Sequence, residues 1–484
     1  MAERHAPIEA HVWRISAVVI LGSVMSILDT TIVNVALATL GRDLHSTIAE
    51  IQWVVTGYML ALAAVIPVSG WAAERFGVKR MYLLSLVFFT AGSMLCGLST
   101  STGELVGFRV LQGVGGGMIL PLGQMMMAAA AGPTRMGRVM SVAAIPVMLA
   151  PILGPTLGGV ILESVSWRWI FYVNVPVGAL AVAAGLRALP APAAGAAARP
   201  LDVRGLALMV TGLPLLTYGL AEVGTTGGVG SAKVLVPCLA GLALIGAFAW
   251  HALRARAPLL ELRLYRRATF SSASATMFLL GAALFGGMIL LPLYWQQVRH
   301  ESVIQTGLLV APQGLGAALA MPFAGRLTDR LGGGPLAVVG VVVSAVATVP
   351  FGLIGAHTSI AWLCAAMVVR GLGIGFAFMP VMTAAFAALD RSELADATPQ
   401  MNVVQRVGGS LGTALLAVVL QRALVGAHTP AGAAAAYGVA FWASVAMTAV
   451  AVAPAVVLLR AERAARAARR AQGLVEAALD PATA

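Results

Sequence analysis

The stretch GWAAERFG at residues 70–77 returns as GRLTDRLG at residues 325–332. Both copies follow the pattern Gly-x-x-x-acid-Arg-apolar-Gly, and each comes directly after a long apolar segment. A looser second repeat has Arg109 and Arg370 each before a run rich in Gly that ends in Pro. Similarity at a fixed offset indicates duplicated structural units, and transporters are commonly built from such units with the substrate site between them. The sequence therefore predicts two homologous halves.

The composition places these halves in a membrane. The chain has 484 residues, of which 59% are hydrophobic and only 10% charged, whereas soluble domains are about a quarter charged. Apolar segments of about 20 residues, long enough to cross a bilayer as helices, recur along the whole chain and predict fourteen spans. The expected fold is an all-α polytopic membrane protein, with a six-helix bundle at 1–190, two additional helices at 191–267, a second six-helix bundle at 268–460 and an Arg/Ala-rich cytoplasmic tail at 461–484.

The distribution of positive charge predicts the orientation. Lys and Arg concentrate in the short loops on the side of the termini, which the positive-inside rule assigns to the cytoplasm. The tail continues this pattern with a stripe of Arg that we expect to lie on anionic headgroups. The net charge is +12, but the Lys and Arg residues lie singly or in short clusters between apolar segments, so the lipid bilayer is the expected partner and nucleic acid is not. Residues expected on the outer side are Arg42, Arg168, Lys233, Arg299 and Arg422, and the stripe consists of Arg460, Arg463, Arg466 and Arg470.

Asp29 is the strongest single indication of function. It stands in the middle of the first apolar segment, where a charged side chain costs about 2.5 to 3.5 kcal/mol on insertion scales. Something must offset that cost. Desolvation can raise the pKa of a carboxyl group into the range where it binds and releases protons at physiological pH, so such a group can serve as a proton carrier. Helix bonding alone is the structural alternative. Arg109 lies at a similar depth in the fourth span and could pair with Asp29 or bond helix carbonyls.

The loop repeats and the fifth span suggest conformational roles. The two acids of the repeats could form charge contacts between the halves, or could stabilise the start of the helix that follows each loop. Small residues in the fifth span could make a hinge, or could permit close static packing. The candidate gating residues are Gly70, Glu74, Arg75, Gly77, Arg80, Gly325, Asp329 and Arg330, and the candidate hinge residues are Gly154, Pro155, Gly158 and Gly159.

Candidate substrate contacts are weaker. Aromatic residues near helix ends are usually interfacial anchors, and Met in a membrane core is usually filler. We nevertheless keep a small set of polar and aromatic residues as candidates for the substrate site: Asn34, Tyr58, Gln112, Tyr294 and Trp295. The sequence has no nucleotide-binding loop and no His pair at metal-ligand spacing. We therefore expect no metal and no cofactor, with a proton gradient as the energy source.

Five motifs, in order along nearly the whole chain, resemble the fourteen-helix drug:proton antiporters of the EmrB/QacA type within the major facilitator superfamily. They are the first-helix motif LDTTIVNVAL at 28–37, the loop motif at 70–80, the fourth-helix motif RVLQG at 109–113, the antiporter motif GPTLGG at 154–159, and WRWIFYVNVP at 167–176. Glu74 departs mildly from the usual Asp of the loop motif. Ala38 replaces a usual Pro. The thirteenth span carries Arg406 but no predicted acid, which argues against efflux of divalent cations.

The resemblance implies rocking halves, proton coupling at Asp29 beside Arg109, and a hinge in the fifth helix. The expected function is proton-coupled efflux of small amphipathic organic compounds by a monomer in a bacterial cytoplasmic membrane, with any accessory envelope protein unknown. A dedicated exporter of one host metabolite or lipid is the alternative with the same fold. A membrane enzyme or sensor is disfavoured, because the loops leave no room for a catalytic domain.

Overall fold

The computed structural model describes residues 8–132, 135–190, 199–226, 228–390, 392–427 and 429–479. These residues are overwhelmingly helical and contain no strand. Thirteen helical segments within them are long and apolar enough to cross a membrane, and α6 adds a further apolar helix. The predicted all-α polytopic fold is confirmed, and the protein is a multi-pass membrane protein.

The N half consists of α1 to α8. Its long helices are α1 (Ala10–Asp43), α2 (Ile48–Val65), α4 (Val78–Leu98), α5 (Thr102–Ala131), α6 (Met136–Ser164) and α8 (Asn174–Ala188). The second span continues from α2 through a 3-10 turn, η2 (Ile66–Val68), into α3 (Ser69–Phe76), and a short helix, α7 (Trp169–Tyr172), precedes α8.

The C half consists of α11 to α17. Its helices are α11 (Ala268–Gln297), α12 (Val303–Leu331), α13 (Gly333–Gly352), α14 (Ile360–Ala387), α15 (Leu394–Leu424), α16 (Pro430–Val450) and α17 (Val452–Leu479). The last span is formed by α16 with the first part of α17, which runs on without a break into the predicted tail.

The two halves repeat the same packing. In the N half α5 packs on α2 and α4, and α1 packs on α6; in the C half α14 packs on α12 and α13, and α11 packs on α15. The helix starts repeat as well. Thr47 and Glu50 form a capping box at the start of α2, and Ser302 and Gln305 form one at the start of α12, at the same offset that separates Gly70 from Gly325. Capping boxes satisfy free N–H groups at helix starts, so α2 and α12 begin at equivalent positions of the repeat.

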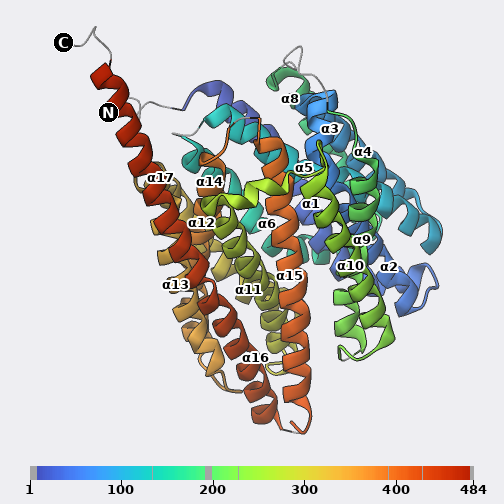
Figure 1. Ribbon diagram of the computed structural model, residues 1–484. Helices are drawn as coiled ribbons and strands as arrows, with labels where there is room; N and C mark the ends of the chain where they lie inside the picture. The colour runs from blue at the N-terminus through green and yellow to red at the C-terminus, as the bar shows by residue number, and fades with distance from the viewer. Residues whose placement is uncertain are drawn as a thin grey trace.

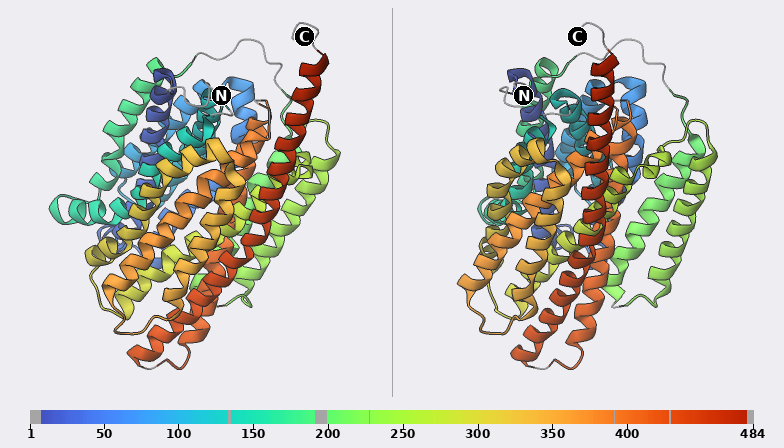
Figure 2. Two further views of the ribbon diagram at one scale, coloured as in Figure 1. Left: turned by 90° about the vertical axis from the view of Figure 1, so that its left-hand side faces the viewer. Right: turned by 60° about the vertical axis from the view of Figure 1, so that its left-hand side comes forward.

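The two extra helices lie at one side of the bundle (Figures 1 and 2). They are α9 (Val203–Thr226) and α10 (Ala232–Arg254), and a 3-10 segment, η3 (Leu262–Arg266), leads back to α11. α9 packs on both α2 and α15, with Trp53 stacked on Tyr218. Asp202 connects the start of α9 with the end of α10 and the segment after it. Its carboxylate accepts hydrogen bonds from the N–H groups of Gly205 and Leu259 and contacts His251. The pair therefore covers one seam between the halves.

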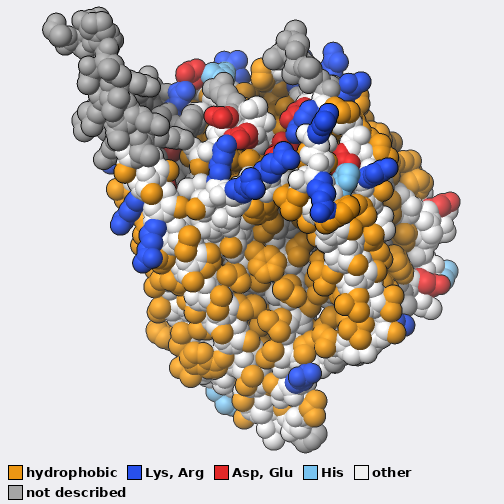
Figure 3. Space-filling view, in the orientation of Figure 1, with side chains coloured by type: hydrophobic (Ala, Val, Ile, Leu, Met, Phe, Trp, Pro, Cys, Tyr) orange, Lys and Arg blue, Asp and Glu red, His pale blue; other side chains and the backbone are white. Residues whose placement is uncertain are grey.

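The bundle has two chemically different ends. We call the end where α1 begins and α17 ends the terminal face, and the opposite end the distal face (Figure 1). On the face that Figure 3 shows, a wide apolar band crosses the middle of the molecule, while Lys and Arg gather near the terminal face. One buried core joins both halves towards the terminal face, whereas at the distal face each half has a core of its own. The halves are thus closed together at the terminal face.

Candidate functional site

Asp29 and Arg109 meet inside the N half. Asp29 on α1 and Arg109 on α5 are both completely buried, and Nη1 of Arg109 donates to Oδ2 of Asp29 at 2.5 Å. Their similar depths along the two helices predict that these side chains can pair, and the structure places them in contact. Two opposite charges that compensate each other explain how both are accommodated in the apolar interior.

Two amide side chains complete the carboxylate's coordination. Oδ1 of Asp29 accepts from Nε2 of Gln112 at 2.9 Å and from Nδ2 of Asn174 at 3.0 Å. Asn174 also donates to the hydroxyl of Ser93, from α4. The two oxygens of Asp29 are therefore surrounded by donors from one cation and two neutral amides. The carboxylate thus links α1 to α5 through Arg109 and Gln112 and to α8 through Asn174.

Arg109 is held from several sides. Its Nε donates to the carbonyl of Val54 on α2 at 3.1 Å, and its Nη1 also donates to Oε1 of Gln112 at 2.8 Å. The guanidinium lies 4.2 Å from the centre of the Tyr58 ring, whose hydroxyl is 3.2 Å from that of Ser26. A cation over an aromatic face is attracted to it. Of the predicted substrate residues, Tyr58 and Gln112 therefore belong to the cluster around Asp29.

The other predicted substrate residues lie elsewhere. Tyr294 and Trp295 are buried in the distal core of the C half, where Tyr294 donates to the carbonyl of Gly355 at 2.8 Å. Asn34 is exposed, on the part of α1 nearer the distal face. The structure therefore does not bring these three residues to the Asp29 cluster.

The loop repeats are helical rather than loops. Gly70 to Phe76 belong to α3, and Gly325 to Leu331 end α12. Only the last glycine of each copy forms the turn: Gly77 has φ 87° and Gly332 has φ 97°, conformations that other residues adopt at a steric cost. The expectation of cytoplasmic loops here is wrong in that detail, because the helices continue to the final glycine.

Asp329 bridges the halves at the seam between α12 and α6. Its carboxylate accepts from the N–H of Gly137 at 2.9 Å and of Arg138 at 3.3 Å, and lies 3.6 Å from the Arg138 side chain. Gly137 and Arg138 lie in the first turn of α6 of the N half, and a helix start attracts negative charge. The alternative that Asp329 serves the following helix is wrong, since Glu462 of α17 accepts from the first N–H groups of α13. Gly325 permits this contact, because a Cβ there would lie 2.8 Å from the carbonyl oxygen of Gly137.

Glu74 bridges the opposite seam through a third residue. Arg199 donates to both carboxylate oxygens of Glu74 at 2.7 and 2.8 Å, and lies 3.1 Å from the carboxylate of Asp396 in the first turn of α15. Trp71 fixes the same position by donating to the Arg199 carbonyl. At Gly70, a Cβ would collide with the carbonyl of Ala395. Each repeat thus places its first glycine against the opposite half, and its acid contacts that half directly at Asp329 and through Arg199 at Glu74.

The remaining gating candidates have no such role in this conformation. Arg75, Arg80 and Arg330 form no hydrogen bond or ion pair with the residues that the structure describes. Of the tail arginines, Arg466 donates to the carbonyl of Leu331 at the end of α12 and to Glu462 on α17. This arginine therefore contacts other parts of the protein instead of facing only headgroups.

The hinge candidates divide by the side of α6 they occupy. Gly154 faces α1, where an added Cβ would collide with Thr31, and a Cβ on Gly158 would be 3.4 Å from Ile32. Gly159 has open space around its Cβ position. The side chain of Pro155 lies outside the described residues. α6 is continuous across this region, so Gly154 serves close packing next to Asp29, and the hinge stays a prediction.

Sequence reasoning missed several residues of these contacts, and also a further contact between the halves. Asn174 was visible as the polar residue of WRWIFYVNVP, but nothing local shows that it faces Asp29. Arg199 lies in the linker, and Asp396 stands just before the apolar window, so the expectation of a thirteenth span without an acid is wrong. Gln124 accepts from Asn402 at 2.7 Å across the halves, a contact that only the tertiary structure reveals.

Comparisons with known proteins agree with this architecture. The family model of the Major Facilitator Superfamily matches residues 19–413. The multidrug resistance protein B homolog of Mycobacterium tuberculosis is 42% identical over 412 residues, covering 84% of this chain and 76% of that relative. The multidrug export protein EmrB of Escherichia coli is 30% identical over 403 residues, covering 82% and 77%.

Solved structures show the same fold at low sequence identity. A human organic anion transporter superposes with a TM-score of 0.63 at 14% identity, covering 92% of this chain and 99% of that one. A proton:xylose symporter superposes with a TM-score of 0.62 at 15% identity, covering 92% and 95%. At these identities the likeness concerns the arrangement of helices alone.

Proposed function

The chain belongs to the major facilitator superfamily and is a membrane transporter rather than an enzyme, and from this premise we propose that it exports amphipathic organic compounds in exchange for protons. The names of its relatives, a multidrug resistance protein and a multidrug export protein, support the choice of substrates. The observation that carries the proton coupling is the buried carboxylate of Asp29, held by Arg109 and two amides.

The proposed cycle uses the ion pair as the coupling device. With the termini in the cytoplasm of a bacterial cell, the closed terminal face makes this conformation the one that faces outwards. A proton arriving from outside neutralises Asp29 and frees Arg109 from its partner, which lowers the affinity for substrate. Reorientation exposes Asp29 to the cytoplasm, where deprotonation restores the pair and the affinity. Each charge moved across the membrane supplies about 2.3 kcal/mol per 100 mV.

The first prediction tests the role of Asp29. Purified protein in proteoliposomes with an imposed pH gradient should concentrate a dye that is chosen beforehand in a whole-cell accumulation screen. We expect Asp29→Asn to abolish uphill transport, because the amide cannot bind a proton in this pH range, while exchange of labelled for unlabelled dye persists. Asp43→Asn is the matched control, since Asp43 ends the same helix at an exposed position.

Uphill transport by Asp29→Asn at the wild-type level would refute the coupling role. A separate experiment, competition among chemically unrelated dyes, distinguishes broad efflux from a dedicated exporter of one metabolite or lipid. Mutual inhibition by unrelated dyes supports broad efflux, and insensitivity of one substrate to all the others supports the dedicated exporter.

A further inference from the structure

Arg370 is a buried cation in the C half without a carboxylate partner. Its side chain is 2% exposed in the middle of α14. Nη1 donates to Oε1 of Gln313 at 2.9 Å and Nη2 to the carbonyl of Ala283 at 3.3 Å, while Nε is buried and has no partner. Among the described residues no carboxylate lies within ion-pair distance of it. Two neutral acceptors therefore serve a guanidinium that has five N–H donors.

The repeat shows what Arg370 lacks. Arg370 corresponds to Arg109, and α11 corresponds to α1, which supplies Asp29 in the N half. Yet α11 contains no Asp or Glu, and neither do α13 and α14. One turn along α11 from Ala283, Gly287 also faces the guanidinium, and an added Cβ there would collide with Nη2. The C half has kept the cation of the pair and not the anion.

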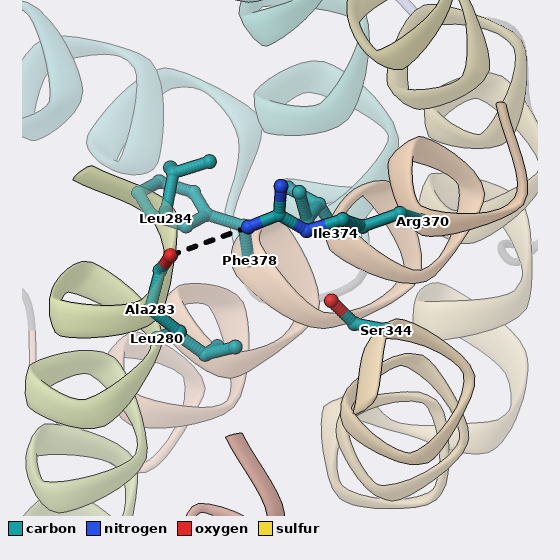
Figure 4. Close-up of a pocket in the computed structure, with 7 residues that line it drawn as sticks. All are labelled: Leu280, Ala283, Leu284, Ser344, Arg370, Ile374 and Phe378. Atoms are coloured by element: carbon teal, nitrogen blue, oxygen red, sulfur yellow. Dashed lines mark hydrogen bonds between the residues drawn. The ribbon is translucent and has the colours of Figure 1, made fainter. Parts of the chain in front are cut away.

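A small cavity adjoins the unpaired guanidinium (Figure 4). Residues of α11, α13 and α14 line it, and it offers space for a particle about the size of one water molecule. Besides the guanidinium, its polar contributions are the hydroxyl of Ser344 and the carbonyl of Ala283. The apolar lining comes from Leu280, Leu284, Ile374 and Phe378.

We propose that this cavity binds a small monovalent anion, chloride in the first instance, which neutralises Arg370 as Asp29 neutralises Arg109. An arginine cannot shed its charge in proteins, and an isolated cation in the middle of the membrane is costly. A chloride ion beside the guanidinium compensates that charge, and because chloride is somewhat larger than water, the lining side chains must yield slightly to admit it. The acid group of an organic molecule would supply the same negative charge, but the small volume of the cavity favours a single inorganic ion.

Thermal unfolding of the purified protein tests this proposal without any reference to transport. Potassium chloride or bromide is titrated from 1 to 100 mM against potassium methanesulfonate, a bulkier monovalent anion, at constant ionic strength. We expect a saturable rise in Tm of about 2 °C with either halide, since a ligand that binds only the folded state stabilises it. Arg370→Gln should lose this rise, and the exposed Arg422→Gln should retain it.

Two further variants supply the missing carboxylate from the protein. Gly287→Asp and Ser344→Asp each place an acid beside Arg370, and at Gly287 only the flexible end of the guanidinium must move. Each folded variant should have a raised Tm in methanesulfonate and no response to halide. The proposal is overturned if wild type shows no anion-specific rise, or if Arg370→Gln keeps the full rise. A rise with benzoate but not with halide, lost in Arg370→Gln, would assign the site to the acid group of an organic molecule.

Discussion

Replacing Arg199 with Gln should loosen the closed terminal face at one seam only. Arg199 lies between two acids of opposite halves, Glu74 on α3 and Asp396 on α15. Burial by itself lowers the pKa of Arg199, but its hydrogen bond with Glu74 and the charge of Asp396 outweigh burial and raise this pKa above its ordinary value. The guanidinium is therefore charged at every physiological pH, and its removal leaves two carboxylates facing each other.

The expected effect follows from the partial burial of these side chains. Their exposed fractions are 31% for Arg199, 26% for Glu74 and 11% for Asp396. Exposed ion pairs contribute about 0.2 to 1 kcal/mol, and breaking a buried pair costs about 3 to 5 kcal/mol. Contacts of intermediate exposure should therefore contribute about 1 to 3 kcal/mol, which corresponds to an approximately 5- to 150-fold shift in the equilibrium between closed and open terminal faces.

Hydrogen exchange in lipid nanodiscs measures this shift directly, because the exchange of protected amides follows the population of the open state. We expect faster exchange in α3 and in the first turn of α15 of Arg199→Gln, with the start of α6 less affected. Arg263→Gln is the control, since Arg263 is half exposed and pairs with Glu261 in its own segment.

A charge-compensated variant tests the proposed cause. Adding Glu74→Gln and Asp396→Asn to Arg199→Gln removes the repulsion between the acids, so exchange should return part of the way to the wild-type rate. Unchanged exchange in α3 of the single variant would refute the reasoning. Exchange in the triple variant as fast as in the single variant would show that repulsion is not the cause.

Two further predictions concern the same end of the molecule. Gly70→Val should block closure, because its Cβ meets the backbone carbonyl of Ala395; dye flux should be lost while the folded yield stays normal, and Gly103→Val, with open space around it, is the control. Asp202→Asn should lower the free energy of unfolding at pH 7 by about 1 kcal/mol. Burial by itself raises the pKa of Asp202, but hydrogen bonds from Gly205, His251 and Leu259 outweigh burial and lower it. Its contribution is therefore present at neutral pH and lost as the pH falls below about 4, so the Tm values of the two proteins should converge there, and a difference that persists at pH 3 would contradict this assignment.

Most of the fold can be predicted from short stretches of the sequence, each considered by itself. Each span is an apolar segment of the length that a bilayer requires, and the repeat is visible as two short patterns at one offset. The pairing of Asp29 with Arg109 was also predictable, because both depths follow from counting residues along a helix. These features depend on one segment, or on two segments whose depths are fixed by the membrane.

The partners of the gating acids were beyond such reasoning. Glu74 and Asp329 stand in equivalent positions, yet one binds a linker arginine and the other binds backbone N–H groups of α6. The choice depends on what the opposite half presents at that point, and no pattern around either acid encodes it. Asn174 was missed for the same reason, since its contact with Asp29 depends on how α8 packs against α1.

The difference between the two seams has a physical origin in the first turns of α6 and α15. α6 begins without an acid, so the N–H groups of Gly137 and Arg138 can bind Asp329 directly. α15 carries Asp396 in its first turn, which would repel Glu74, and Arg199 is needed between them. Arg199 lies only a few residues before α9, so opening the α3–α15 seam must break contacts of the linker, whereas the α6–α12 seam can open without it. The two extra helices are therefore tied to one of the two seams, and the halves are symmetric in their helices but not in what holds them closed.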